Sequence, residues 1–193
     1  MNAIRQKSQL ILEYEQRFTS VLSLKVLDKP QLHIWMIFIP IIFVHYYFEW
    51  QKYKNCRMSF KKNYICNFKL ALDEAVVLVQ DGREPDFDTL VKMPDIPAGA
   101  QQKLTELFAV LIEHYEVLLR ATGCDYRSLV RSAYIKRANY LLYINQLNNA
   151  EKKFNAALKP QLETTIDDVN DIICAIERNS EKIRRNHAEE IFA

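Results

Sequence analysis

The sequence predicts an all-α protein, and three observations support this prediction. Only three of the 193 residues are glycine, while leucine, isoleucine, alanine, lysine and glutamate are abundant. Apolar residues recur every three or four positions over most of the chain, as on one face of a helix. The prolines and glycines that end helices gather mainly between residues 80 and 100. We therefore divide the chain into residues 1–30, 31–50, 51–80, 81–100 and 101–193.

The first segment, residues 1–30, has the pattern of an amphipathic helix. Its apolar residues follow helical spacing: Ile4, Ile11, Tyr14, Phe18, Val21 and Leu22. Pro30 is expected to end this helix near Asp28. The opposite face mixes acidic with basic residues, so it lacks the lysine-rich face of a helix that lies on a membrane. We expect this helix to pack against the later ones.

Residues 31–50 form the most apolar stretch, and we interpret it as a membrane-embedded segment. Residues 34–44 carry no charge, and only Pro40 interrupts the apolar run. Aromatic residues and then a cluster of lysine and arginine follow. This order matches the hydrocarbon, headgroup and anionic-lipid layers that a chain crosses on its way into the cytoplasm. The predicted membrane-interface residues are Trp35, Tyr46, Tyr47, Trp50, Lys52, Lys54 and Arg57.

Three arrangements of this segment remain open, because residues 32–48 are fewer than the roughly 20 residues that span a bilayer. A single helix kinked at Pro40 crosses the membrane, or a re-entrant hairpin turns at Pro40 with both ends on one side. In the third arrangement, the segment is a helix buried inside a soluble bundle. The aromatic and basic residues at one end favour the membrane. The larger basic cluster on the C-terminal side predicts that this side is cytoplasmic.

Residues 51–80 are predicted to form a basic stalk helix next to the membrane. Neither proline nor glycine occurs between Pro40 and Gly82, so a helix that begins at Pro40 is expected to run to Gly82. Its second half has the apolar spacing of a helix that packs on a core. The loop that follows, residues 81–100, contains Asp86 and Asp88, either of which is suited to cap a short helical turn.

Residues 101–193 are predicted to form a helical bundle. A first helix is expected over residues 101–121, with Gly123 as its C-cap. Asp125 is expected to cap a second helix, and Asn148 with the asparagine after it marks a turn or kink before a third. We expect these last two helices to pair in an antiparallel arrangement.

The C-terminal helix carries a heptad pattern of apolar residues over about four heptads. The predicted seam residues are Leu162, Ile166, Val169, Ile173, Ile176 and Ile183. Ser180 and His187 occupy the same seam and weaken it toward the end. The seam either packs inside the bundle of its own chain or binds outside it. In the second case, it forms a homodimeric coiled coil or contacts a helical protein partner.

The sequence carries no signature of a catalytic, cofactor or metal site. Three glycines provide neither a phosphate-binding loop nor a dinucleotide fingerprint, and a net charge of +2 argues against a nucleic-acid partner. The cysteines are Cys56, Cys66, Cys124 and Cys174. Because they lack the spacing of zinc ligands, we expect small buried residues in a reducing compartment. His114 is expected on a solvated helix face, since no Glu-x-x-His pair accompanies it.

These patterns predict a membrane-anchored helical interaction or adaptor protein without catalytic activity and without a cofactor. Its expected partners are the lipid bilayer and, through the C-terminal helix, a second copy or another helical protein. The alternative is a soluble all-helical binding module. The third class is a small membrane-attached enzyme, whose first candidate residues are His33 and His45, on either side of the apolar run.

Overall fold

The protein is an all-α bundle, as predicted. The structure is a computed structural model that describes residues 2–26, 40–91, 97–162 and 169–193. Within α2, it describes the side chains of Lys54, Asn55, Met58 and Lys61 and those from Ile65 onward. The described residues form seven helices: α1 (Asn2–Val26), α2 (Pro40–Asp81), α3 (Phe87–Val91), α4 (Ala98–Arg120), α5 (Tyr126–Tyr134), α6 (Arg137–Leu162) and α7 (Val169–Phe192).

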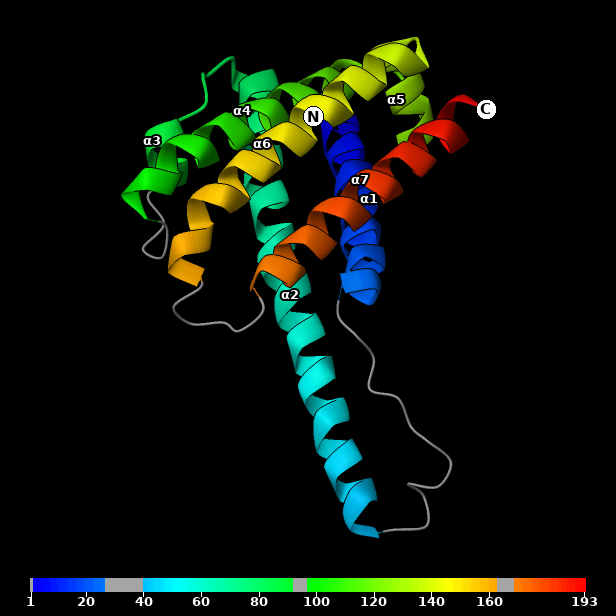
Figure 1. The fold of residues 1–193 in the computed structure, drawn as a ribbon. Coiled ribbons are helices and arrows are strands. Elements are labelled where there is room, and N and C mark those ends of the chain that lie inside the picture. The colour runs from blue at the N-terminus through cyan, green and yellow to red at the C-terminus, as the bar shows by residue number, and fades with distance from the viewer. Residues whose placement is uncertain (1, 27–39, 92–96, 163–168) are drawn as a thin grey trace.

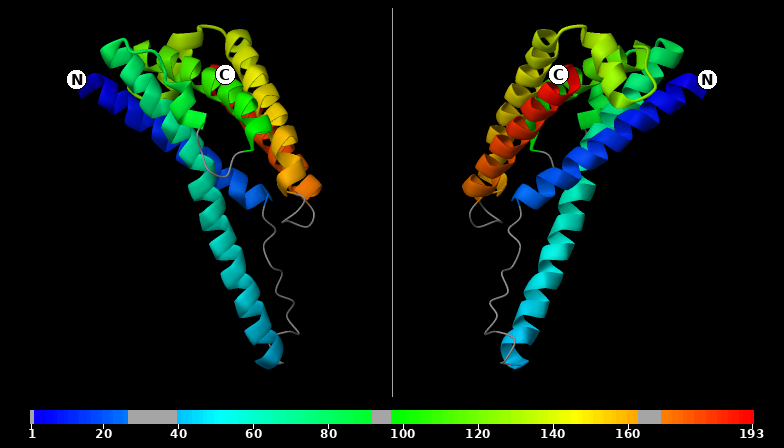
Figure 2. Two further views of the ribbon diagram at one scale, coloured as in Figure 1. Left: turned by 90° about the vertical axis from the view of Figure 1, so that its left-hand side faces the viewer. Right: turned by 90° about the vertical axis from the view of Figure 1, so that its right-hand side faces the viewer.

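The five long helices form a closed ring of neighbours. α1 packs on α2, α2 on α4, α4 on α6, α6 on α7, and α7 returns to α1 (Figures 1 and 2). α4 contributes the largest share of the core because apolar residues recur along one wide face of it. Tyr115, Phe108 and Leu111 on this face are completely buried. The short helices α3 and α5 lie against α4 and connect the long ones.

The longest helix, α2, begins and ends where the sequence predicts. It starts at Pro40 and stops before Gly82, whose φ of +66° is the left-handed conformation typical of a helix end. Its C-terminal half packs on the core through residues such as Phe68 and Leu72. Figure 1 shows that its N-terminal half extends well beyond the other helices. A helix of 42 residues is roughly 60 Å long, so α2 is much longer than the bundle is deep.

The membrane prediction concerns residues that the structure describes only in part. No helix in the described ranges has the length and apolarity needed to cross a bilayer. Trp35 lies outside the described residues, and Lys54 is exposed on α2. The following predicted interface residues belong to α2, but their side chains lie outside the described part: Tyr46, Tyr47, Trp50, Lys52 and Arg57. The membrane-embedded segment therefore stays a prediction.

The helix boundary predicted at Asn148 is wrong. The chain instead leaves the helix at Ile135, and α6 then runs without a break past Asn148. Ile135 has a φ of +61°, and the amide of Lys136 donates to the Tyr134 carbonyl at 2.5 Å, which is the geometry of a γ-turn. The Asn148 side chain accepts a hydrogen bond from Arg184, so it does not compete with the helix backbone. The residues before and after Asn148, which were expected to form an antiparallel pair, consequently lie in the single helix α6.

Two further sequence expectations are corrected by the connection between α4 and α5. Cys124, like Cys66 and Cys174, is exposed rather than a small buried residue. α4 ends at the cap residue Ala121, two positions before the glycine expected to cap it. Asp125 does cap α5 as predicted.

Gly123 is needed for close packing at the start of α5. A Cβ atom at this position would lie 2.5 Å from Ser128 Oγ and 2.7 Å from the Leu129 amide nitrogen. Ser128 Oγ accepts a hydrogen bond from the Asp125 amide at 3.1 Å, while Asp125 Oδ1 accepts from the Ser128 amide at 2.7 Å. A side chain at Gly123 therefore collides with the capping box that begins α5.

Gly123→Ala is expected to lower the free energy of unfolding by at least about 1 kcal/mol, because it displaces the capping box. The matched control is Gly99→Ala, where nothing lies within 4 Å of the added Cβ and alanine is the better helix former. Urea denaturation followed by circular dichroism measures both. Equal stability of Gly123→Ala and the parent protein would contradict the packing role.

Candidate functional site

A solvent-open groove of about 500 Å³ lies between α1, the start of α5 and α7. This volume is within the range of about 300–1,000 Å³ that is typical of ligand pockets. The floor of the groove is mostly aliphatic and aromatic. The floor residues are Leu10, Tyr14, Phe18, Val21, Tyr126 and Ile183. This groove is the candidate functional site in the described part of the chain.

The two long walls of the groove are antiparallel helices. The α1 floor residues follow one another at spacings of four, four and three, so they share one face. The Tyr14 ring stacks on the His187 ring of α7 with centroids 4.9 Å apart. One turn further along α1, the Arg184 guanidinium lies 4.9 Å from the centroid of the Phe18 ring. Residue numbers on α7 therefore fall as those on α1 rise.

An aromatic stack joins α1 to α5 in the floor. The rings of Tyr14 and Tyr126 are nearly parallel, at an interplanar angle of 9°, with centroids 3.7 Å apart. Tyr126 is the first residue of α5, so the capping box at Asp125 determines where this ring lies. Stacked aromatic rings bury a large apolar area and lose few rotamers when they bind a ligand. The floor between α1 and α5 is thus apolar and aromatic.

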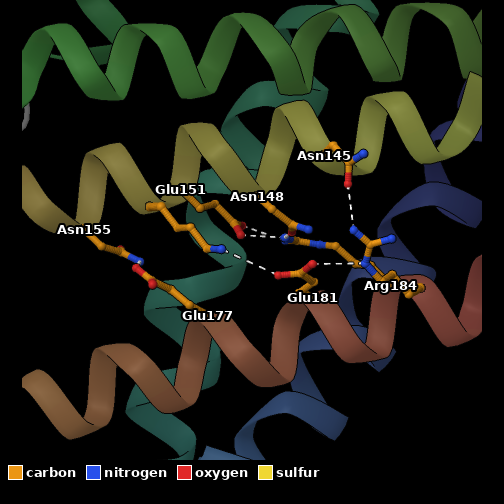
Figure 3. A network of polar contacts seen from close by, with 9 residues as sticks. Asn145, Asn148, Glu151, Asn155, Glu177, Glu181 and Arg184 are labelled. Atoms are coloured by element: carbon orange, nitrogen blue, oxygen red, sulfur yellow. Dashed lines mark hydrogen bonds and ion pairs between the residues drawn. The ribbon is translucent and has the colours of Figure 1, made fainter.

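A buried arginine holds α7 in place as a wall of the groove (Figure 3). Arg184 is 5% exposed. Its Nη1 donates to Asn148 Oδ1 at 2.6 Å and to Glu151 Oε2 at 2.5 Å, and its Nη2 donates to Glu151 Oε1 at 2.6 Å. A buried charge is tolerated only when it is paired and hydrogen-bonded. This bidentate pair therefore specifies one register of α7 on α6.

More exposed polar contacts continue along the α6–α7 interface (Figure 3). They pair Asn155 with Glu177, Lys152 with Glu181, and Arg185 with Asn145. Residue numbers on α6 fall as those on α7 rise, so these two helices are also antiparallel. Exposed pairs of this kind contribute only about 0–1 kcal/mol each. These pairs form as a result of the α6–α7 register that Arg184 specifies, and they do not determine that register.

Beneath the floor, α1 buries a carboxylic acid. Glu15 is 5% exposed, and its Oε1 accepts a 2.9 Å hydrogen bond from the Tyr115 hydroxyl of α4. Burial raises the pKa of Glu15 to about 7, although the Tyr115 hydrogen bond and the positive charge of Arg184 both oppose the rise. The adjoining cavity, of about 10 Å³, has room for about one water molecule. Glu15 therefore acts on the stability of the core rather than on a ligand in the groove.

His114 lies in the core, which corrects the prediction of a solvated helix face. Its Nδ1 is 2.7 Å from the Tyr134 hydroxyl, and its ring stacks on Tyr143 with centroids 3.8 Å apart. Burial, aided by the positive charge of Arg184, lowers the pKa of His114 to about 3, so the ring is neutral. In the ranges that the structure describes, no three His, Cys, Asp or Glu side chains are grouped to hold a metal ion.

The predicted seam of the C-terminal helix is described only from its middle onward. Ile166 and the side chains of Leu162 and Val169 lie outside the described residues. The other seam residues, Ile173, Ile176 and Ile183, are all half-buried. Ile176 and Ile183 pack against the core of their own chain, and Ile183 also lines the groove. Binding of a second copy or a partner helix by this seam stays a prediction.

The residue that anchors α7 was missed by sequence reasoning. The most buried stripe of this helix is Ser180, Arg184, Ala188 and Ile191. Arg184 stands among basic residues and therefore has the pattern of a solvated helix end. A signal was present, because the small and apolar members of the stripe recur at helical spacing around it. The two walls of the groove are more than 150 positions apart, and no local pattern connects them.

Comparison of the chain with protein-family models, curated proteins and solved structures found no match.

Glu15→Gln is expected to stabilise the protein by up to about 3 kcal/mol above pH 7, because the folded state must ionise Glu15 at a raised pKa of about 7 instead of 4.5. The folded state binds this proton more tightly than the unfolded state, so the penalty disappears as the pH falls from 7 to 4.5. Urea titrations of the variant and the parent across this range measure the difference. Because burial lowers the pKa of His114, its contribution to the free energy of unfolding rises with pH. This contribution is the same in the variant and the parent, so it cancels from their difference.

The control for this titration is Glu13→Gln, which removes a partly exposed carboxylate from the same helix. It is expected to change the free energy of unfolding by less than about 0.5 kcal/mol. If the difference in free energy of unfolding between Glu15→Gln and the parent does not vary with pH, the ionisation of a buried Glu15 is ruled out.

Proposed function

We propose that the protein is a helical binding module that holds an α-helix of a partner protein in the groove between α1, α5 and α7. One observation carries the proposal: an open groove of about 500 Å³, with a mostly apolar and aromatic lining, lies between two antiparallel helices. Val21 in this floor is 41% exposed. An amphipathic helix that lays its apolar face into such a groove is a common mode of protein recognition.

The dimensions of the groove suit a helix. Its α1 wall runs from Leu10 to Lys25, which is roughly 22 Å at 1.5 Å per residue. A partner helix of about 15 residues has the same length. A third helix seated between two antiparallel ones packs side chains from both walls against its own, as neighbouring helices of a bundle do. The floor residues of α1 recur at the spacing that such packing requires.

The buried acid and the buried histidine of the core support binding rather than chemistry in the groove. Glu15 and His114 are buried beneath the floor, and their hydrogen-bond partners are tyrosines of the core. Neither side chain lines the groove. The charged residues that do line it stand at its edges, mostly exposed, as polar residues do at the rim of a protein interface.

The test is selection of helical peptides of about 15 residues on the full-length protein, followed by measurement of their Kd by fluorescence anisotropy. Val21→Glu is expected to weaken the binding of the selected peptides at least about ten-fold, because it places a charge on the apolar floor. The matched control is Leu24→Glu on the same helix, since Leu24 is exposed but does not line the groove. Failure to select any peptide, or equal binding by Val21→Glu, would refute the proposal.

A second candidate function is attachment to a bilayer through the N-terminal half of α2. This half extends away from the other helices (Figure 1). Residues 41–48 on it are apolar except for His45, and Lys52 and Lys54 follow. An apolar segment next to lysines is suited to enter a membrane that contains anionic lipid.

Full-length protein is then expected to float with vesicles of phosphatidylcholine and phosphatidylserine in a density gradient. Phe43→Asp should abolish flotation, because it carries a charge into the hydrocarbon region. Met58→Asp, at an exposed position further along α2, should retain it. Recovery of the unmodified protein at the bottom of the gradient would exclude bilayer attachment.

A further inference from the structure

We infer that the groove recognises a charge-separated helix, with basic side chains at one end and acidic side chains at the other. The basic end of this helix lies beside Glu13 and Glu190, and its acidic end lies beside Lys25 and Lys182. The inference rests on the proposed function, because it specifies the chemistry of the helix that the groove holds.

The two groove carboxylates on α1 and α7 lie toward the same end. Tyr14 on α1 faces His187 on α7, and the two helices are antiparallel. Glu13 precedes Tyr14, whereas Glu190 follows His187 by three residues, or about 4.5 Å along the helix axis. Both steps lead toward the N-terminus of α1. The α5 wall adds Asp125 and also Arg127, whose opposite charges offset each other.

The other end of the groove is basic on both long walls. Arg17 and Lys25 follow Tyr14 on α1, and Lys182 precedes His187 on α7, so all three lie toward the C-terminus of α1. Their side chains are exposed. Among the residues that the structure describes, none of these three cations has a carboxylate within 4.0 Å. Their charge is therefore not neutralised within the described bundle.

This separation of charge favours one class of helix over others with the same apolar face. A helix with a basic and an acidic end places opposite charges beside both ends of the groove at once. A helix whose charges alternate along its length brings like charges together on each wall. Complementary charges at an interface set the register and exclude wrong partners, and they weaken as salt is added.

Two stapled helical peptides of about 15 residues test the inference. They have identical composition and identical leucines on one face. The separated peptide has three lysines in its first turns and three glutamates in its last turns. The mixed peptide alternates these six residues. Staples keep both helical, so that their own charge patterns do not change helicity. The separated peptide is expected to bind about ten-fold more tightly to the full-length protein at low ionic strength, and this ratio should fall toward one at high salt.

The protein variant that tests the same point is Arg17→Glu combined with Lys182→Glu, both at exposed positions. It should abolish the preference for the separated peptide, whereas Lys136→Glu, on an exposed residue away from the groove, should leave it unchanged. A nitroxide at the lysine end of the peptide should broaden amide signals near Glu190 more than those near Lys25.

Equal binding of the two peptides, a preference that is insensitive to salt, or broadening at the opposite end would overturn the inference. In each of these cases, binding that Val21→Glu still weakens would leave the groove as a helix site. If neither peptide binds and the peptide selection also fails, the proposed function and the inference fall together.

Discussion

The structure depends on one buried charge, the guanidinium of Arg184. It pairs with Glu151 and Asn148 of α6 while it lies against the Phe18 ring of α1, so a single side chain connects three helices. Removing one member of a buried ion pair typically costs about 3–5 kcal/mol, a large fraction of the stability of a domain. Sliding α7 by one residue would break both hydrogen bonds to Glu151. The width and depth of the groove follow from this fixed position of α7.

The interior around this charge is aromatic and polar rather than aliphatic. The tyrosines that gather there are Tyr14, Tyr115, Tyr126, Tyr134, Tyr140 and Tyr143. The hydroxyl groups of Tyr115 and Tyr134 give one hydrogen bond each to Glu15 Oε1 and His114 Nδ1. Hydrogen bonds are directional, so such a core specifies one arrangement of helices more strictly than a purely aliphatic core does. Tyr14 and Tyr126 of this cluster also line the groove.

Local signals predicted the helix ends, whereas contacts distant in sequence determined the site. Pro40, Gly82 and Asp125 act through their own backbone or their nearest neighbours, so α2 and the start of α5 were predictable. The break at Ile135 involves neither glycine nor proline, and nothing local marks it. Tyr14, Phe18 and Val21 were recognisable as the packing face of α1, which is half of the groove floor. The rest of the floor includes Tyr126 of α5 and Ile183 of α7. The rotation of α7 is set by the burial of Arg184, and a charged residue in a basic run does not reveal that burial.

The single unbroken helix α2 also has a mechanical consequence. An α-helix is stiff along its axis, so a load applied to its distal tip travels through continuous hydrogen bonds to Phe68 and Leu72 beneath α4. Because no glycine or proline interrupts the rod, it contains no hinge to absorb a torque. Any tilt imposed on the tip is thus delivered as a small rotation against α4 and α1, the helices that supply Tyr115 and its hydrogen-bond partner Glu15.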